Sequence, residues 1–239
     1  MRGKIARGVR RLGGWAAGRV GVLSLFALAC IGSPDGDGGR SAGVPEAGAA
    51  TGRLPVVLFL GTSLTAGYGL ADDQAFPALI QQRVDSIGLR YRMVNAGVSG
   101  ETSAGGLRRI GWLLREPVAV LVLELGANDG LRGQSVAAMR ANLQAIIDST
   151  RAIHPDVAVV IAGMEAPPNM GGAYTRAFRE AFPALARAND ATLIPFLLDG
   201  VAAVPSLNQA DGIHPTAEGQ ALMAETVWRY LAPILRRSE

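Results

Sequence analysis

Four short polar stretches carry side chains that could do chemistry. They are GTSLTAG (61–67), GVSGET (97–102), GANDG (126–130) and DGIHP (211–215). Ser63 stands in a glycine-flanked turn after an apolar run, a place that exposes a hydroxyl beside the N–H groups of a helix start. Asp211 lies three residues before His214, so its carboxylate could accept from the imidazole N–H and set the tautomer. A hydroxyl and an imidazole–carboxylate pair form a nucleophilic site if the fold brings them together.

The two middle stretches could bind a developing negative charge. The glycines around Gly100 would let the backbone approach a ligand closely, and Asn128 could present its amide to an oxyanion. Asp129 is expected to bond backbone N–H groups within its own loop. Each stretch also has a simpler interpretation: Ser63 as a helix cap, Thr102 as a helix cap, and Asn-Asp-Gly as an ordinary turn. The local sequence leaves these alternatives open.

Phosphate and metal sites are poorly supported. The pattern GxxxxGK[ST] is absent, and no lysine follows Lys4. The chain has two histidines and one cysteine, so His214 lacks a second His or Cys with which to complete a metal site. His154, just before Pro155, is expected to be a solvated residue at a helix end. The sequence therefore does not favour a phosphate loop or a metal site.

Five short apolar runs must position these stretches. The predicted strands are 56–60, 91–96, 118–125, 157–164 and 191–196. The predicted helices are 76–87, 102–114, 135–153, 174–189 and 216–231, with Ser135 and Thr216 as caps. Strict alternation of strand and helix predicts an α/β fold with a parallel sheet covered on both faces. In such sheets, ligand sites form at the carboxyl ends of the strands.

The first 29 residues have the features of a secretory signal. They contain six basic residues and no acidic one, and the apolar run 20–31 that follows is too short to span a bilayer comfortably. The segment FALAC (26–30) resembles a bacterial lipobox, which implies cleavage before Cys30 and lipid attachment there. Ordinary cleavage after Ala29 and a retained anchor are the alternatives. The expected location is the periplasm or cell envelope, with a lipid anchor in the membrane.

Composition bounds the remainder. Residues 30–53 are rich in Gly, Ala, Ser and Pro and are predicted to be a flexible linker, so the folded domain is expected over 54–239. A hydrophobic content of 49% excludes a mainly disordered chain, and a single cysteine excludes a disulfide scaffold. Beyond the leader, 17 basic residues stand against 20 acidic ones, a net charge of −3. Nothing here favours binding of DNA or RNA.

Taken together, the polar stretches resemble the SGNH/GDSL hydrolase family, in the branch of bacterial arylesterases, thioesterases and lysophospholipases. GTSLTAGYG (61–69) is similar to the GDSL block, NAGVSGETS (95–103) to the second block, LELGANDGLRG (123–133) to the third and DGIHP (211–215) to the fifth. The four blocks occur in order, and the likeness spans about residues 55–235. One position departs from the pattern: Thr62 stands where the family name has Asp. We expect a changed turn network there and retained activity.

The resemblance implies a fold, a site and a reaction. The fold would be a three-layer α/β/α sandwich with a flavodoxin-like, five-stranded parallel sheet. Ser63, Asp211 and His214 would form the catalytic triad, and the oxyanion hole would be built by Ser63, Gly100 and Asn128. The substrate would be a small acyl ester or a lysophospholipid, hydrolysed without cofactor, with thioesterase capability, by a protein expected to be a monomer.

Three other interpretations compete with this one. The wider superfamily includes polysaccharide O-acetyl esterases, although no carbohydrate-binding module is appended here. A lipid-binding lipoprotein with idle catalytic residues and a nucleotide-binding flavodoxin-like module are the non-hydrolytic alternatives. The segment 163–174, with its prolines, glycines and methionines, is expected either to line an acyl pocket or to be an ordinary surface loop.

Overall fold

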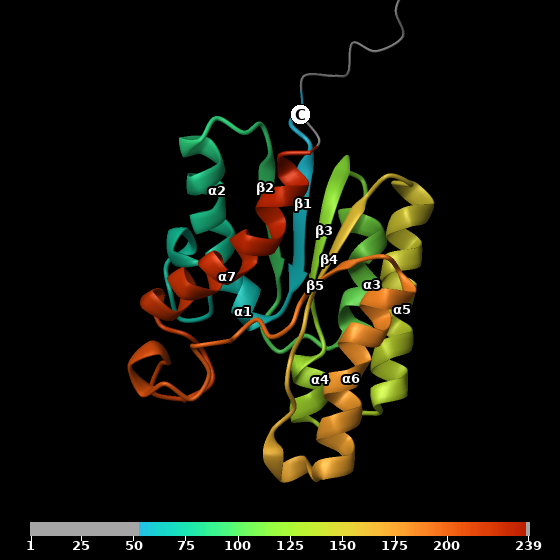
Figure 1. Cartoon of the computed structure of the whole chain (residues 1–239), viewed down its shortest axis with the longest axis vertical. Helices are drawn as coiled ribbons and strands as arrows, with labels where there is room; N and C mark the ends of the chain where they lie inside the picture. Colours follow the sequence, from blue (N-terminus) through green and yellow to red (C-terminus); the bar gives the residue numbers. More distant parts are fainter. Residues whose placement is uncertain (1–52, 238–239) are drawn as a thin grey trace, which may run out of the picture. The chain divides into compact units, whose positions relative to one another are not determined.

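The computed structural model describes residues 53–237, which contain one five-stranded sheet with the strand order β2-β1-β3-β4-β5 (Figure 1). All neighbouring strands are parallel. The strands are β1 Val56–Gly61, β2 Arg92–Gly97, β3 Val118–Glu124, β4 Ala158–Ala162 and β5 Thr192–Ile194. The α/β class and the five-stranded parallel sheet predicted from the alternating pattern are therefore confirmed.

Helices cover both faces of this sheet. They are α1 Ser63–Ala66, α2 Phe76–Ser86, α3 Ser103–Leu113, α4 Ala127–Leu131, α5 Val136–Ile153, α6 Gly172–Ala188 and α7 Ala217–Leu235. Figure 1 shows α2 and α7 on one side of the sheet and α3, α5 and α6 on the other, which makes three layers. Three short 3₁₀ turns lie at Asp72–Gln74, Pro168–Met170 and Pro205–Leu207.

The core lies on both sides of the central strands. Every residue of β1 is buried, and β3 is buried except for one position. Continuous apolar runs such as VVLFL suit strands covered on two faces, and each large side chain buried there stabilises the fold by about 1.5–3 kcal/mol. Phe59 of β1 packs edge-to-face on Phe76 at the start of α2, with ring centroids 5.5 Å apart. This contact joins β1 to the start of α2.

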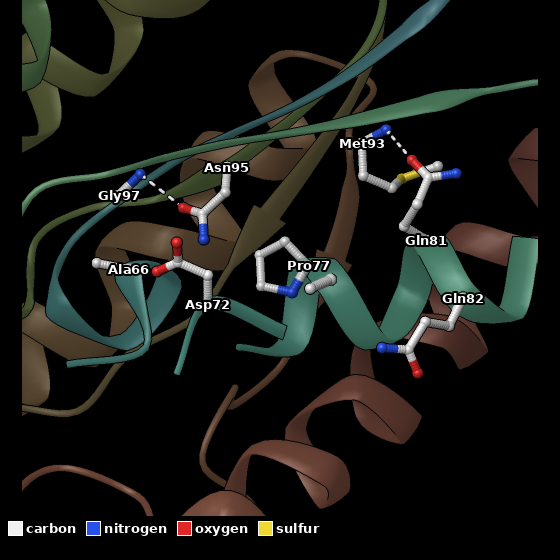
Figure 2. A pocket seen from close by; sticks show the side chains of 9 residues that line it. Ala66, Asp72, Pro77, Gln81, Gln82, Met93, Asn95 and Gly97 are labelled. Carbon is white, nitrogen blue, oxygen red and sulfur yellow. Dashed lines mark hydrogen bonds between the residues drawn. The ribbon is translucent and has the colours of Figure 1, made fainter. Parts of the chain in front are cut away.

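The edge strand β2 is protected by a side chain from α2. Gln81 accepts a hydrogen bond from the Met93 N–H at 2.7 Å and donates to the Tyr91 carbonyl at 3.1 Å. Its amide therefore pairs with the strand edge, which would otherwise expose backbone groups. Figure 2 shows the bond between Gln81 and Met93 beside a hollow between α1, α2 and β2. The hollow has a volume of about 590 Å³ and is lined by both polar and apolar side chains. The residues of the predicted site do not line this hollow.

The ends of β1, β2 and β3 bring three of the four polar stretches, 61–67, 97–102 and 126–130, to one edge of the sheet. Gly61 at the end of β1 is the register partner of Gly97 on β2 and of Glu124 on β3. In the sheet, β2 lies on one side of β1 and β3 lies on the other, so the order of the strands reverses direction at β1. This is where open parallel sheets bind ligands.

The predicted strands and the five long helices are all present, with ends that differ by a few residues. The short helices α1 and α4 were not predicted. Helix α7 continues to Leu235, four residues beyond the predicted end at Leu231. Ala232 and Leu235 of its last turn are buried, and the Leu235 carbonyl accepts from the Tyr91 hydroxyl at 3.2 Å, so tertiary contacts hold this turn despite Pro233.

The predicted leader (1–29), the linker (30–53) except its last residue, and Cys30 lie outside the described residues. Among residues 53–237, no helix is long and apolar enough to cross a membrane.

Candidate active site

Ser63 lies in a tight turn between β1 and α1. Thr62 occupies the N-cap position of α1, and its side chain accepts from the Leu64 N–H at 3.4 Å. Thr62, and not Ser63, therefore caps the helix, which leaves the Ser63 hydroxyl for another partner. Ser63 itself is half-buried.

The Ser63 hydroxyl lies 2.9 Å from Nε2 of His214, and Nδ1 of His214 lies 2.6 Å from Oδ2 of Asp211. A carboxylate can only accept, so the proton of a neutral imidazole belongs on Nδ1, and Nε2 is free to accept from Ser63. The hydrogen bond from His214 is the main cause that holds the pKa of Asp211 well below its usual range. The N–H groups of His214 and Ile213 also donate to this carboxylate.

Gln209 ties the loop that carries His214 to the loop that follows Ser63. Its Nε2 donates to the Tyr68 carbonyl at 2.7 Å and to the Pro215 carbonyl at 3.0 Å. Its backbone N–H donates to the His214 carbonyl at 2.7 Å. The Tyr68 ring packs against the imidazole, with centroids 4.5 Å apart. These contacts set the position of His214 over the α1 turn, although 150 residues separate the two loops.

Gly100 and Asn128 line the same cavity as Ser63 and His214. Gly100 has φ +77°, a backbone conformation that favours glycine, and its carbonyl accepts from Arg132 Nη2 at 2.9 Å. Asn128, in α4, donates from Nδ2 to the Glu101 carbonyl at 3.0 Å. One of its two amide N–H bonds is used in this contact, and the second remains for a ligand.

Asp129 is structural, as expected, but its partner is not its own loop. Its buried carboxylate accepts from the Ser103 N–H at 2.8 Å and from the Ser103 hydroxyl at 2.6 Å. Thr102 occupies the N-cap of α3 without a side-chain capping bond. The interpretation of Thr102 as a cap is therefore correct in position, but the capping bond at the start of α3 comes from Asp129 of the next loop.

A cavity of about 850 Å³ joins these residues. Ser63, Gly100, Asn128 and His214 all line it. Its apolar lining comprises mainly Leu64, Leu131, Met164, Ala166, Pro167, Pro168, Phe196, Leu198 and Ile213. The first half of the segment 163–174 therefore forms one wall, as one of the two sequence interpretations expected. The wall from 196 to 203 and the ring of Tyr68 were not predicted, because nothing in their local sequence marks them.

Glu124 at the end of β3 is a further polar residue at this edge that sequence analysis missed. It is 1% exposed, and its carboxylate contacts the turn that carries Ser63. The available signal was an acidic residue inside the apolar run VAVLVLEL. Such an acid is rarely buried without partners.

The second histidine lies away from this cavity. His154 ends α5, but it is half-buried, and its Nε2 lies 3.1 Å from the Leu114 carbonyl, so the expectation of a solvated residue was wrong. The His, Cys, Asp and Glu residues in 53–237 include no group of three that could hold a metal ion.

Comparison with known proteins places this geometry in a family. The profile of the GDSL-like Lipase/Acylhydrolase family matches residues 59–222. "Esterase TesA" of Pseudomonas aeruginosa is 43% identical over 180 residues, which is 75% of this chain and 89% of the relative. "Thioesterase 1/protease 1/lysophospholipase L1" of Escherichia coli K12 is 36% identical over 181 residues, 75% of this chain and 84% of the relative.

A solved structure agrees with these sequence matches. The esterase EstA from Pseudoalteromonas sp., in a structure inhibited by monoethylphosphonate, is 32% identical with a TM-score of 0.72. The match covers 76% of this chain and 98% of that one. The family profile agrees with the relatives and with the solved structure. The chain therefore belongs to the GDSL-like lipase/acylhydrolase family of SGNH hydrolases.

Proposed function

We propose that this chain is a serine esterase that cleaves acyl esters through a Ser63–His214–Asp211 triad and an acyl-enzyme. The supporting observation is the continuous set of hydrogen bonds from the Ser63 hydroxyl through His214 to Asp211, 2.9 Å and 2.6 Å long, at the wall of an apolar cavity. Membership of a family whose relatives are named esterase and thioesterase supports the same reaction.

In the first step, Ser63 Oγ attacks the ester carbonyl carbon while Nε2 of His214 takes the hydroxyl proton. The Asp211 carboxylate holds the Nδ1 proton and offsets the charge of the imidazolium. A positioned general base of this kind contributes about 10²–10⁴ in rate. His214 then passes the proton to the leaving alcohol as the C–O bond breaks, which leaves the acyl group on Ser63.

The carbonyl oxygen becomes negative in this step and needs donors. The N–H groups of Ser63 and Gly100 and the free amide N–H of Asn128 are assigned to it, because all three residues line the cavity beside the Ser63 hydroxyl. In the second step, water gives a proton to His214 and attacks the acyl carbon through the same oxyanion. The acid leaves, and the proton returns to Ser63.

The cavity favours an acyl chain as the bound group. Its lining is mostly apolar, and a smaller number of polar residues, Ser63, Asn128 and His214 among them, complete it. Such a lining binds an apolar tail and orients a polar centre. An exported enzyme would meet esters and lysophospholipids, and would not meet cytosolic acyl-CoA. We therefore propose lysophospholipids and simple acyl esters as substrates, with thioester cleavage as an activity seen in vitro.

The test is a substrate panel run on matched variants. Wild type, Ser63→Ala and Ser99→Ala would be assayed on p-nitrophenyl esters of rising chain length, lysophosphatidylcholine, an acyl-CoA and acetylated xylan. Ser99 lines the same cavity, so its variant controls for loss of a hydroxyl there. We expect Ser63→Ala to lose turnover and fluorophosphonate labelling while Ser99→Ala keeps both. Hydrolysis by Ser63→Ala would reject the triad, and preference for acetylated xylan would indicate a polysaccharide esterase.

Export and anchoring form a separate proposal that rests on the sequence. We propose that the leader directs export, that the chain is cleaved before Cys30, and that Cys30 carries lipid holding the enzyme in the cell envelope. Expression of wild type and Cys30→Ala in bacteria fed a radiolabelled fatty acid tests this. Label and membrane association are expected only in the wild type. An unlabelled, soluble wild-type protein would indicate ordinary secretion.

A further inference from the structure

Glu124 is a buried acid that the proposed reaction does not use. Its carboxylate accepts hydrogen bonds from Thr62 and Thr65, in the turn that carries Ser63. Oε2 accepts from the Thr62 N–H at 2.7 Å and from the Thr65 hydroxyl at 2.8 Å. The Thr62 hydroxyl donates to Oε1 at 3.0 Å. No charged side chain within residues 53–237 is hydrogen-bonded or ion-paired to this carboxylate. Its partners are thus the residues on either side of Ser63 and Leu64.

The backbone around Glu124 is built to admit this contact. Gly61 is the register partner of Glu124 across β1 and β3. A Cβ at Gly61 would overlap the Thr65 hydroxyl and crowd the Glu124 carboxylate, so only glycine leaves room for the hydrogen bonds. Thr62 and Thr65 are both completely buried. Water therefore cannot replace the hydrogen bonds within the cluster of Thr62, Thr65 and Glu124.

The cluster acts on Ser63 through the chain. Glu124 fixes both the N–H and the side chain of Thr62, and the peptide between Thr62 and Ser63 carries the Ser63 N–H. The direction of that N–H and the start of the Ser63 side chain are therefore set from β3. The proposed reaction needs the Ser63 N–H to bind the oxyanion and the Ser63 hydroxyl to attack, at the same time.

We propose that Glu124 is a positioning residue, which holds the Ser63 hydroxyl and N–H in their reactive geometry through Thr62 and Thr65. The inference rests on the proposed function, because it assigns a role relative to Ser63 as nucleophile. Glu124 does not line the cavity and has no bond to His214. Its loss should therefore lower kcat and leave KM nearly unchanged.

The charge of Glu124 adds a readout. Burial raises the pKa of Glu124 to about 7, and the hydrogen bonds from Thr62 and Thr65 oppose that rise. Two other charged or titratable side chains are hydrogen-bonded to this turn. Arg109, paired with Glu101, donates to the Gly61 carbonyl at 3.5 Å. His214, paired with Asp211, lies 2.9 Å from the Ser63 hydroxyl. A carboxylate accepts more strongly than a neutral acid. The turn should be held more firmly as Glu124 ionises.

Glu124→Gln tests this, because an amide has the shape of the protonated acid and cannot ionise. We expect the ratio of wild-type to Glu124→Gln kcat/KM to rise between pH 6 and pH 8 by about fivefold, the effect of exchanging one charged hydrogen bond for a neutral one. The two proteins differ only at residue 124, so a change of the ratio with pH reports on that residue. A ratio that stays flat with pH would reduce Glu124 to a structural role and overturn the proposal.

Thr65 gives a second test that leaves the acid in place. Thr65→Val removes one donor to Glu124 and should lower kcat about fivefold, whereas Thr65→Ser keeps the hydroxyl and should restore it. Thr150→Val is the matched control, since Thr150 is also fully buried and its hydroxyl bonds only the Ile146 carbonyl in α5. Wild-type kcat in folded Thr65→Val would overturn the proposal.

Active-site titration with a fluorophosphonate separates this inference from the proposed function. If wild type is not labelled at Ser63, the proposed function fails and the positioning role fails with it. If Ser63 is labelled at the same rate in wild type, Glu124→Gln and Thr65→Val, the proposed function stands and only the positioning role is refuted. We expect slower labelling per folded molecule in both variants.

Discussion

Replacing Asn128 with alanine removes a carboxamide from the cavity wall and leaves the α4 turn with a good helix former. If its free N–H binds the oxyanion, kcat should fall by about 10²–10³, or about 2.7–4 kcal/mol of transition-state stabilisation. The other loss is the 3.0 Å bond to the Glu101 carbonyl. That carbonyl belongs to a half-buried residue, so the bond accounts for at most about 0.5–1.5 kcal/mol of folding stability.

These two magnitudes separate the roles. A stability loss of that size lowers Tm by only a few degrees in a domain of this length and leaves nearly all molecules folded at 25 °C, so it cannot reproduce a hundredfold fall in kcat. The assay is steady-state hydrolysis of p-nitrophenyl butyrate beside thermal melts, with KM expected to change little. Asn142→Ala is the matched control, because Asn142 is also half-buried and bonds the Ser103 hydroxyl at 3.0 Å without lining the cavity. A kcat for Asn128→Ala within threefold of wild type would remove Asn128 from the oxyanion hole.

Three further predictions concern the supporting residues. Asp129→Ala strands the buried Ser103 N–H and hydroxyl, and should lower the free energy of unfolding by about 2–3 kcal/mol in urea titrations; an unchanged midpoint would contradict this. The pKa of Glu124 is about 7 when folded against 4.5 as the reference, so the folded state holds this proton more tightly. Its contribution to stability is present below pH 4.5 and is lost as pH rises through 7. Wild type should therefore lose stability relative to Glu124→Gln over that interval. Parallel curves of unfolding free energy against pH for the two proteins would refute this. Thr62→Asp introduces the Asp of the family name but places a second carboxyl group against Glu124. Activity should persist, and its dependence on pH should move to higher pH. An unchanged pH–rate profile would speak against contact between the two side chains.

The long, strongly patterned elements were predictable because burial dictates them. The runs 56–60 and 118–125 are continuous and apolar, and a strand covered on both faces tolerates little else. The caps Ser135 and Thr216 were also correct, and each accepts a bond from its own helix. Helices α1 and α4 were missed because one turn of helix has no periodicity to detect.

The candidate site was predicted only where chemistry marks it. Hydroxyl, imidazole and amide side chains are conspicuous in a turn, so Ser63, His214 and Asn128 were recognisable. Gln209 was not, because its role depends on two carbonyls, at Tyr68 and Pro215, that only the folded chain brings together. Asp129 was assigned to the wrong partner for the same reason. Contacts between loops distant in sequence leave no local pattern from which to read them.

Two walls of the cavity come from the loops that follow β4 and β5, whereas Ser63 follows β1 directly. Residues 164–168 follow β4, and residues 196–203 lie between β5 and α7. Neither segment shares in the register of the strands that place Ser63. If the proposed function holds, substitutions in these two connections should alter which acyl groups are accepted and leave the turn that carries Ser63 unchanged. The two walls of the cavity are thus separate in the chain from the strands that position Ser63.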